Sequence, residues 1–321
     1  MTSMPSIAVS GATGFLGRAM ASTLHKKNYV VFGLTRGVAD QTPVAGTTYR
    51  VVDYASSESL SAGLRGCSGV VHLAGIAHAH ASAAQGEMLA EYRSAIVEST
   101  LRLWDAAASA GCQTFVYASS VKVYGESSGG AVIDEDSKCE PVSVYGRCKL
   151  EAEGLLRERA KRSNMRLCIL RFPPMYGPNM KGAVRHLFRT AKWHIPLPVY
   201  GLTNQRSFLF VGNAALIVEA VLRGDLAEPL YVLGEPPAWT IGEFYSAIHR
   251  AVHGSDLPRL LRWSMPDLLA KKMQASTAPW QALLVPFAVR SKYTESLEKL
   301  GLFDSSSALA ITAKAKDHGQ Q

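Results

Sequence analysis

The sequence has no long apolar run and no paired cysteine motif, and each absence excludes a class of protein. A membrane-spanning helix needs ~18 or more apolar residues in a row, and no stretch of this chain approaches that length. Residues 1–11 carry no basic stretch and no long apolar core, so we expect no secretory signal peptide. The composition, 47% hydrophobic and 19% charged, is typical of a globular protein with a buried core.

The cysteines and the basic residues are scattered along the chain rather than grouped. No CxxC spacing occurs among the five cysteines, and we interpret them as reduced thiols in a cytoplasmic protein. The net charge of +8 favours an anionic ligand, such as one that carries phosphate. Because Lys and Arg are spread along the chain, we expect no nucleic-acid partner, and we expect no insertion into a membrane.

Short apolar runs alternate with helical stretches through the first half of the chain. The strands are predicted at 6–10, 29–34, 48–53, 69–74, 114–118 and 165–171, and the helices at 15–27, 57–64, 87–110 and 145–161. This alternation implies right-handed crossovers and a parallel sheet that is covered on both faces. The fold class predicted is therefore α/β, with a doubly wound sheet of the Rossmann type.

The pattern changes after Arg171, where five prolines between 173 and 198 interrupt regular structure. We predict a dinucleotide-binding domain over 1–171 and a smaller, mostly helical substrate-binding domain over 172–321, parts of which return to the first domain. Doubly wound sheets bind their ligands in the crevice at the carboxyl ends of the strands, and we place the second domain over that edge.

A glycine-rich turn follows the first predicted strand directly. Its glycines have the spacing GxxGxxG within GATGFLG, residues 11–17. Glycines at this place allow a tight turn and let a pyrophosphate approach the main-chain amides, and the next helix points its N-terminal amides at the anion. The cofactor-binding residues predicted from this turn are Gly11, Thr13, Gly14, Phe15, Leu16 and Gly17.

The end of the second strand bears on which nicotinamide cofactor is bound. An acidic residue there would accept hydrogen bonds from the adenosine ribose and favour NAD. This chain instead has Arg36, nineteen residues after Gly17, and a guanidinium can hold a 2′-phosphate with two hydrogen bonds. NADP is therefore favoured, with NAD as the alternative. Asp53, at the end of the third strand, is predicted to meet the adenine ring.

Ser120, Tyr145 and Lys149 form the predicted catalytic set. Tyr145 and Lys149, in the segment YGRCK, lie one helical turn apart, so the ammonium can approach the phenol. A nearby positive charge favours the phenolate, so we expect a lowered pKa that makes the phenol a usable proton donor or acceptor. Ser120 can bond the same substrate oxygen, and Lys149 can also hold the nicotinamide ribose.

With these motifs in order, the chain resembles the extended short-chain dehydrogenase/reductase family, which contains nucleotide-sugar epimerases, dehydratases and 4-ketoreductases. The similar segments are 11–17, Asp53, HLAG at 72–75, SSVKVYGE at 119–126, 145–149, 171–178, 204–208 and 291–302. The resemblance implies that Leu73, Ala74 and Gly75 bind the cofactor. It also implies that Arg206 grips a nucleotide diphosphate.

Segments 119–126 and 181–208 look more closely like bacterial enzymes of surface-polysaccharide synthesis that act on UDP-linked N-acetylhexosamines. Our leading hypothesis is an enzyme that reduces the 4-keto group of a UDP-4-keto-6-deoxy-N-acetylhexosamine. A 4-epimerase of UDP-sugars with retained NAD is the alternative, since the same residues serve both reactions. A third hypothesis, from another class, is an NADP-sensing regulator without catalysis. The presence of Ser120, Tyr145 and Lys149 counts against it.

The predicted substrate-binding residues are Ser120, Lys122, Tyr145, Lys181 and Arg206, the substrate is a UDP-sugar, and a homodimer is the candidate assembly. Two departures from the family stand out. Dehydratases carry an Asp-Glu pair where this chain has Val121 and Lys122, which argues against 4,6-dehydration. The family also often has an Asn where this chain has Ile96.

Histidines were considered as metal ligands. His78, His80 and His194 have no ligand-like spacing with other histidines, cysteines or carboxylates. The sequence therefore predicts no metal site.

Overall fold

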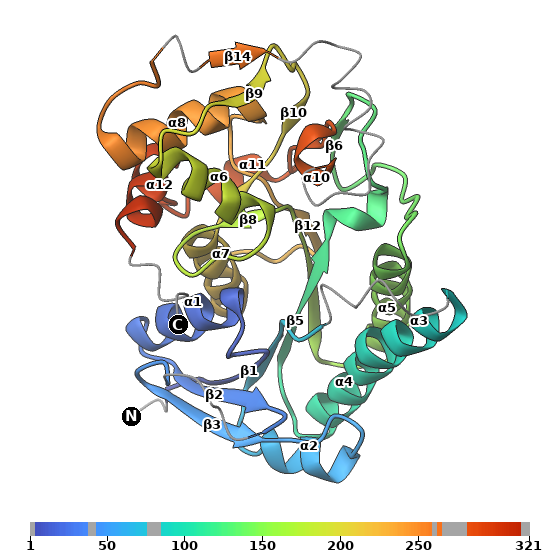
Figure 1. Cartoon of the computed structure of the whole chain (residues 1–321). Helices are drawn as coiled ribbons and strands as arrows, with labels where there is room; N and C mark the ends of the chain where they lie inside the picture. The colour runs from blue at the N-terminus through green and yellow to red at the C-terminus, as the bar shows by residue number, and fades with distance from the viewer. Residues whose placement is uncertain (1–3, 38–42, 76–84, 259–261, 265–280, 316–321) are drawn as a thin grey trace. The chain divides into compact units, whose positions relative to one another are not determined.

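The structure is a computed structural model that describes residues 4–37, 43–75, 85–258, 262–264 and 281–315 (Figure 1). The chain forms two compact units. The first unit takes in 1–125, 138–171 and 214–231, and the second takes in 126–137, 172–213 and 232–321. One division falls directly after Arg171, but the chain also exchanges two internal segments between the units. The functional division into 1–171 and 172–321 stays a prediction.

A seven-stranded sheet forms the centre of the first unit. Its order is β12-β7-β5-β4-β1-β2-β3, and the pairs among β1 to β5 run parallel. The bounds are β1 Ser6–Ser10, β2 Val30–Thr35, β3 Thr47–Val51, β4 Gly69–His72, β5 Thr114–Ser120, β7 Arg166–Phe172 and β12 Leu230–Val232. The chain moves outward from β1 to β3 and then returns to place β4 on the other side of β1. That reversal is the topological switch point at which such sheets bind ligands.

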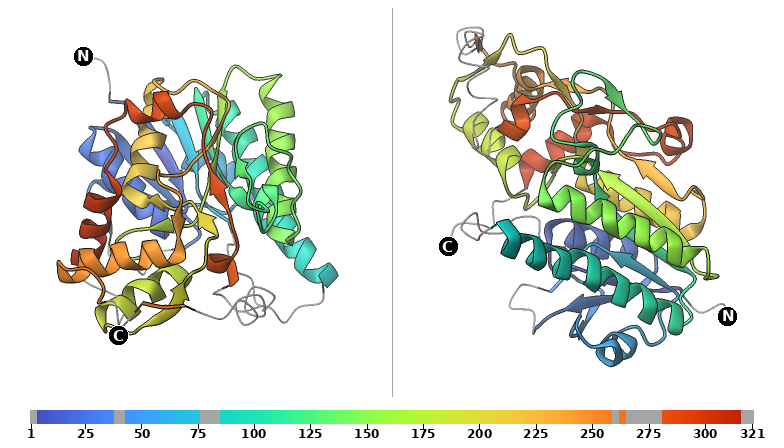
Figure 2. Two further views of the ribbon diagram at one scale, coloured as in Figure 1. Left: turned by 90° about the horizontal axis from the view of Figure 1, so that it is seen from above. Right: turned by 90° about the vertical axis from the view of Figure 1, so that its right-hand side faces the viewer.

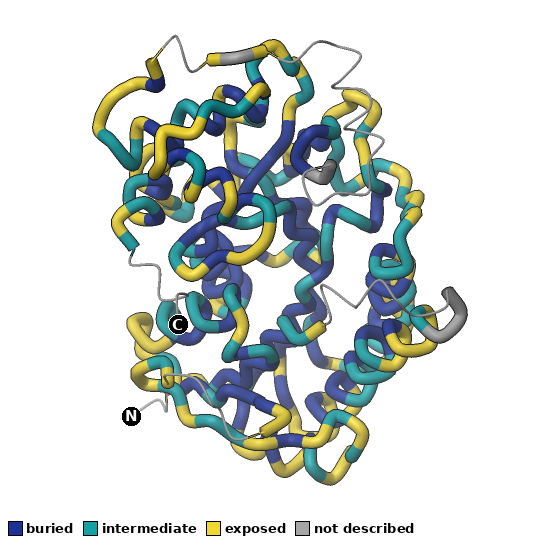
Figure 3. Tube along the Cα trace, in the orientation of Figure 1, coloured by how far each residue is buried: buried dark blue, intermediate teal, exposed yellow. Residues whose placement is uncertain are grey.

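Helices cover both faces of this sheet, as the doubly wound pattern requires. They are α1 Phe15–Lys26, α2 Ser57–Gly63, α3 Gln85–Tyr92, α4 Ser99–Ser109, α5 Val144–Ala160 and α7 Val211–Arg223, the last of which begins in the second unit. On one face α4 and α5 run side by side (Figure 2). The inner strands β1, β4 and β5 are buried along nearly their whole length (Figure 3). The predicted fold class is confirmed.

The helix predicted over 87–110 differs from the prediction in its middle. A π-helical segment, Arg93–Glu98, separates α3 from α4. Apolar periodicity continues through the segment, with Ile96 and Val97 buried, so the pattern shows a helix but not its change of pitch. Single π-helical turns inside α-helices are rare and occur frequently at functional sites.

The start of α5 is set by a cap and by a close backbone approach. The Ser143 side chain accepts a hydrogen bond from the amide of Gly146 and ends the preceding loop. A Cβ at position 146 would lie 2.5 Å from the carbonyl oxygen of Lys122. Only glycine therefore lets this helix approach the end of β5, and this approach brings Tyr145 toward Ser120.

Short strands and five helices make up the described part of the second unit, apart from the start of α7. The helices are α6 Ala183–Lys192, α8 Ile241–His253, α10 Gln281–Leu284, α11 Thr294–Glu298 and α12 Ser305–Lys314. The strands are β6 Val132–Ile133, β8 Met175–Tyr176, β9 Leu197–Tyr200, β10 Gln205–Arg206, β11 Leu209–Phe210, β13 Trp239–Thr240, β14 Arg262–Ser264 and β15 Ala288–Val289. Both α6 and α12 pack on α8. Beneath α8, the rings of Phe208 and Phe244 stack with centroids 4.1 Å apart.

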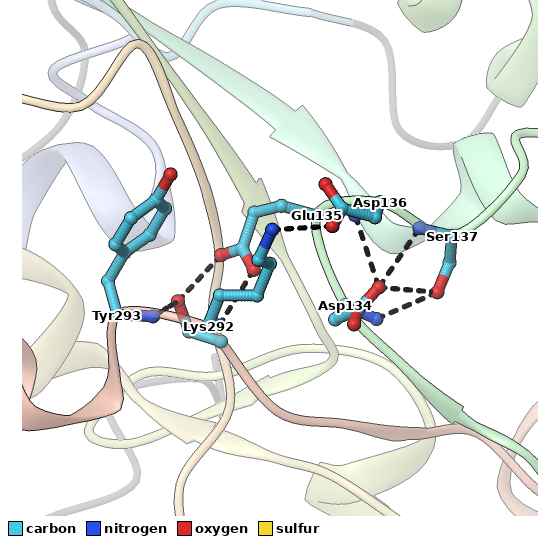
Figure 4. A network of polar contacts seen from close by, with 7 residues as sticks. Asp134, Glu135, Asp136, Ser137, Lys292 and Tyr293 are labelled. Carbon is cyan, nitrogen blue, oxygen red and sulfur yellow. Dashed lines mark hydrogen bonds and ion pairs between the residues drawn. The ribbon is translucent and has the colours of Figure 1, made fainter.

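Hydrogen bonds from an acidic segment connect parts of the second unit that are distant in sequence (Figure 4). The carboxylate of Glu135 accepts hydrogen bonds from the amide of Val232, the hydroxyl of Ser291 and the amide of Lys292. The ammonium of Lys292 in turn pairs with Asp136 at 2.5 Å. These contacts, together with the parallel pairing of β6 and β15, place residues 288–293 beside 132–136.

Among the helices that the structure describes, none is both long and apolar enough to cross a membrane.

Candidate active site

A pocket of about 470 Å³ lies in the first unit at the carboxyl ends of β1, β2 and β4. Seven of the predicted cofactor-binding residues line it: Gly11, Thr13, Gly14, Arg36, Leu73, Ala74 and Gly75. The sequence argument missed other lining residues, among them Tyr54, Ser99 and Arg102. No acidic side chain is among the described residues that line it. The pocket therefore combines a glycine-rich wall with two guanidinium groups.

The turn before α1 leaves main-chain amides available at the pocket. The helix begins at Phe15 after Gly14, which supplies no side-chain cap, and its first turn holds no acidic residue. A Cβ at Gly17 would lie 2.0 Å from the carbonyl oxygen of Gly11, so the turn can close only over glycine. Uncapped amides at a helix N-terminus attract an anion. Leu16 and Gly17 are buried behind this turn and support its shape.

Arg36 and Asp53 occupy different positions relative to this pocket. Arg36 is exposed and lines it beside Tyr54. Burial raises the pKa of Tyr54 to about 12, although the charge of Arg36 acts in the opposite direction. Asp53 is exposed and does not line the pocket; its carboxylate accepts a hydrogen bond from the amide of Ala55 at 2.8 Å. The roles of Arg36 and Asp53 toward the cofactor stay predictions.

Ser120, Tyr145 and Lys149 come together where β5 ends and α5 begins. The ammonium nitrogen of Lys149 lies 5.9 Å from the centre of the Tyr145 ring. Burial raises the pKa of Tyr145 to about 12, and a hydrogen bond with the Ser120 hydroxyl lowers it in part. The sequence predicts a lowered pKa, and the direction found is the opposite. The physical reason is that desolvation of the phenol outweighs the hydrogen bond.

Lys149 is buried and is held by the backbone rather than by a carboxylate. Its ammonium donates a hydrogen bond to the carbonyl oxygen of Ala118 at 2.7 Å. Burial lowers the pKa of Lys149 to about 8, and the charge of Glu153 counteracts part of that shift. A Cβ on Gly75 would lie 3.6 Å from this ammonium. Lys149 thus reaches the wall of the glycine-rich pocket.

Glu153 and Arg171 form a buried ion pair behind the catalytic set. The guanidinium of Arg171 donates to both carboxylate oxygens of Glu153, at 3.0 and 2.6 Å, and to the hydroxyl of Tyr124 at 2.6 Å. The Ser119 hydroxyl donates to the same carboxylate at 2.5 Å. Glu153 was not predicted from the sequence, although it follows Tyr145 and Lys149 at spacings of eight and four, on one face of α5.

A chain of hydrogen bonds fixes the segment HLAG, and the donor and acceptor of each bond can be assigned. Burial, followed by the charge of Lys149, lowers the pKa of His72 to about 3, so its ring is neutral. Thr100 donates to the carbonyl of Ile96 and therefore accepts from Nε2 of His72, at 2.8 Å. Nδ1 of His72 then accepts from Ser10, at 2.5 Å. The Ser10 oxygen also accepts from the amides of Leu73 and Ala74, which line the pocket. This network needs no asparagine at position 96.

The predicted substrate residues outside the catalytic set differ in their surroundings. Arg206, in the second unit, is 3% exposed, and burial lowers its pKa to about 10. It donates to the carbonyl of Val285 at 3.0 Å and lies 5.6 Å from the ring centre of Phe287. Its Nε has no hydrogen-bond partner among the described residues. Lys122 is half-buried beside Ser120, and Lys181 is exposed ahead of α6.

Comparisons with known proteins show the family to which the chain belongs. Residues 7–234 match the NAD dependent epimerase/dehydratase family. The UDP-glucose 4-epimerase of Vibrio cholerae is 31% identical over 234 residues, which make up 72% of this chain and 70% of that protein.

Two solved structures share the fold across almost the whole chain. The UDP-N-acetylglucosamine 4-epimerase of Bacillus cereus superposes with a TM-score of 0.73 at 24% identity, covering 96% of this chain and 95% of that one. The UDP-glucuronic acid 4-epimerase of the same organism, solved with NAD, superposes with a TM-score of 0.72 at 19% identity, covering 96% and 97%. The resemblance in the motifs is therefore confirmed, and the chain belongs to the NAD dependent epimerase/dehydratase family of extended short-chain dehydrogenases.

Proposed function

We propose that this chain is an NAD(P)-dependent enzyme that acts at carbon 4 of a UDP-linked sugar, and that its reaction is the reduction of a UDP-4-keto-6-deoxy-N-acetylhexosamine. The observation that carries the proposal is that Ser120, Tyr145 and Lys149 lie together. The ammonium of Lys149 adjoins Gly75 in the wall of the glycine-rich pocket.

Each member of this group has a task in that reaction. A nicotinamide cofactor held at the pocket would supply the hydride, and the protein has to supply a proton to the resulting oxygen. A phenol whose pKa is about 12 stays protonated at neutral pH, as a proton donor needs. Ser120 holds the same oxygen by its hydroxyl. The ammonium of Lys149 limits the cost of the negative charge that Tyr145 acquires when it gives up its proton.

Arg36 supports NADP as the cofactor. The pocket that it lines contains no acidic residue among those described, and Arg102 provides a second guanidinium. An anion such as the 2′-phosphate of NADP would balance Arg36, whereas the ribose hydroxyl of NAD would not. Arg102 is already paired with Glu98 at 3.2 Å, which leaves Arg36 as the favoured contact.

Arg206 supports a nucleotide diphosphate in the substrate. A buried guanidinium with an unsatisfied Nε and no carboxylate within ion-pair distance, among the described residues, is a costly arrangement unless a ligand brings negative charge. A pyrophosphate fits that need because it offers oxygens in a geometry that the planar guanidinium can bond twice. Lys181 is a further candidate for the same anion.

A second candidate reaction is 4-epimerisation with retained NAD. The similarity to the Vibrio cholerae UDP-glucose 4-epimerase favours it. In that reaction Tyr145 first removes the proton of the 4-hydroxyl, which requires the phenolate. The raised pKa of Tyr145 in the free protein makes this less favourable until ligands add positive charge nearby.

One experiment separates the two reactions and also tests the regulator hypothesis. The purified chain is incubated anaerobically with NADPH and a UDP-4-keto-6-deoxy-N-acetylhexosamine, and separately with NAD and UDP-N-acetylglucosamine, and cofactor absorbance is followed together with the sugar products. Oxidation of one NADPH per product supports the reductase. Formation of the C4 epimer without net cofactor change supports the epimerase. Dinucleotide binding with neither product, in both mixtures, would point to a regulator.

A further inference from the structure

Three histidines that the proposed reaction does not use converge in the second unit. His249 and His253 lie one turn apart at the end of α8, and His194 follows the end of α6. One ring nitrogen of each histidine lies within 4.8 Å of the others. The sequence prediction named His194, with His78 and His80, but did not include the i,i+4 pair of His249 and His253. His78 and His80 lie outside the described residues.

Backbone carbonyls orient two of these rings. Nδ1 of His249 lies 3.1 Å from the carbonyl oxygen of Ser255, and Nε2 of His253 lies 2.8 Å from that of Ala191. A carbonyl oxygen can only accept, so each of these nitrogens carries the proton. The other nitrogen of each ring, Nε2 of His249 and Nδ1 of His253, is then left with a lone pair. Metal-binding histidines are oriented in this way, with the remaining ring N–H bonded to a carbonyl or carboxylate.

The spacing of the rings suits a small divalent ion. Nδ1 of His194 lies 3.0 Å from Nε2 of His249. Two nitrogens bound to tetrahedral Zn²⁺ at 2.0–2.1 Å are separated by about 3.3 Å. At 3.0 Å these two nitrogens share a hydrogen bond, which a bound ion would replace by shared coordination at a similar separation. The three ring nitrogens lie within 4.8 Å of one another, and a rotation of the exposed His194 side chain would bring them to coordination distance.

His194 also occupies a backbone position that normally favours glycine. Its φ is 51°, in the left-handed region. The amide of Ile195 bonds to the carbonyl of Thr190 and the amide of His194 to that of Ala191, which is the Schellman arrangement at the end of α6. A non-glycine residue is disfavoured in this conformation. His194 adopts it, as Asn28 and Asn179 also do elsewhere in the described residues, and it completes the cluster.

The surroundings of the cluster leave it open to a cation on one side. The nearby carboxylate of Asp256 is held by Arg250 at 2.5 Å. His249 is buried whereas His194 is exposed, so an ion can enter from the side of His194.

We propose that His194, His249 and His253 bind a divalent transition-metal ion of the Zn²⁺ class, one ring nitrogen from each, with water in the fourth position. The ion joins the end of α6 to the end of α8 and so acts as a structural crosslink within the second unit. The proposal revises the absence of a metal site predicted from the sequence, and it does not depend on the proposed reaction.

The test uses the full chain without a histidine tag, freed of metal with a chelator. Zn²⁺ binding is measured by calorimetry, and Co²⁺ is used as a spectroscopic probe, because tetrahedral Co²⁺ absorbs strongly in the visible range. We expect one ion per chain and a tetrahedral Co²⁺ spectrum. His253→Gln and His194→Gln should each weaken Zn²⁺ binding by about tenfold or more. His186→Gln, an exposed histidine of α6 outside the cluster, is the matched control and should leave the affinity unchanged.

Several results would overturn the site. They are the absence of stoichiometric Zn²⁺ binding in the micromolar range, an octahedral Co²⁺ spectrum, or equal affinity in the control and in the folded cluster variants. Circular dichroism of each apo variant shows whether it folds. If His253→Gln fails to fold, His194→Gln decides the matter, because its side chain is exposed.

Discussion

Replacing Arg206 by Met should strengthen the fold and remove the response to UDP. The Arg206 side chain is buried, and burial lowers its pKa by more than two units, to about 10. A tenfold change in proton affinity corresponds to about 1.4 kcal/mol, so keeping this charge inside the protein costs roughly 3 kcal/mol. Because the folded-state pKa lies below that of the unfolded chain, the cost is present in full at neutral pH. It declines only as the pH rises through about 10.

The gain expected from the substitution is smaller than this cost. Arg206→Met keeps an apolar stem against Phe287 but loses the hydrogen bond to the carbonyl of Val285. That loss is worth about 1 kcal/mol, so we expect the free energy of unfolding to rise by about 2 kcal/mol. Since no counter-charge lies near it among the described residues, our proposal interprets the guanidinium as a group held ready for an anionic ligand.

Urea unfolding with and without UDP measures both effects together. Wild type at a UDP concentration of about 100 times the Kd should gain about 2.7 kcal/mol, and Arg206→Met should gain almost nothing. Arg189→Met, an exposed arginine of α6 in the same unit, is the control and should behave as wild type. The reasoning is wrong if Arg206→Met unfolds more easily than wild type in the absence of UDP. It is also wrong if UDP stabilises the variant and the wild type equally.

Three further outcomes are expected from the first unit. Tyr145→Phe should lower turnover by about 10²-fold or more, because the hydroxyl proton is lost. The ring remains, so cofactor affinity measured by fluorescence should change little. A variant that keeps more than about a tenth of wild-type activity would contradict the role of Tyr145 as proton donor. Arg36→Ala should weaken NADP binding by roughly 1.5–3 kcal/mol and NAD far less, measured by calorimetry; an equal loss for both cofactors would make Arg36 merely structural. Glu153→Gln leaves the guanidinium of Arg171 buried without its carboxylate and should lower the free energy of unfolding in urea by about 3–5 kcal/mol. The control, Glu140→Gln at an exposed ion pair, should lower it by less than about 1 kcal/mol. Similar losses in both variants would show that the buried pair is not specially stabilising.

Six of the seven strands of the central sheet could be predicted from the sequence to within about two residues at each end, whereas β12 was not predicted. Buried parallel strands need continuous apolar runs, and runs such as Gly69–His72 stand out between glycine turns and helices. The glycine turn could be predicted for the same reason, since its position between β1 and α1 is local. The π-helical segment could not be, because Ile96 and Val97 continue an ordinary apolar pattern through it.

The residues that support the site were harder to find than the residues of the motifs. Arg171 and Glu153 are eighteen positions apart, and each alone resembles a solvated charge. Their pairing depends on β7 lying beside β5, which only the folded sheet provides. The histidine cluster is a similar case: the pair at 249 and 253 is visible as an i,i+4 spacing, but His194 joins it from fifty-five residues away.

The described residues carry an excess of buried positive charge at both proposed ligand sites. In the first unit both carboxylate oxygens of Glu153 accept hydrogen bonds from Arg171. The guanidinium of Arg157 also lies 3.7 Å from this carboxylate. Lys149 is left with a carbonyl as its hydrogen-bond partner, which is consistent with a pKa of about 8. Arg206 in the second unit lacks a carboxylate within ion-pair distance among the described residues. A stable interior would neutralise such groups, and local departures from that rule concentrate at functional sites. Each uncompensated cation stands where the proposed reaction brings negative charge: the phenolate of Tyr145 beside Lys149, and a substrate diphosphate at Arg206.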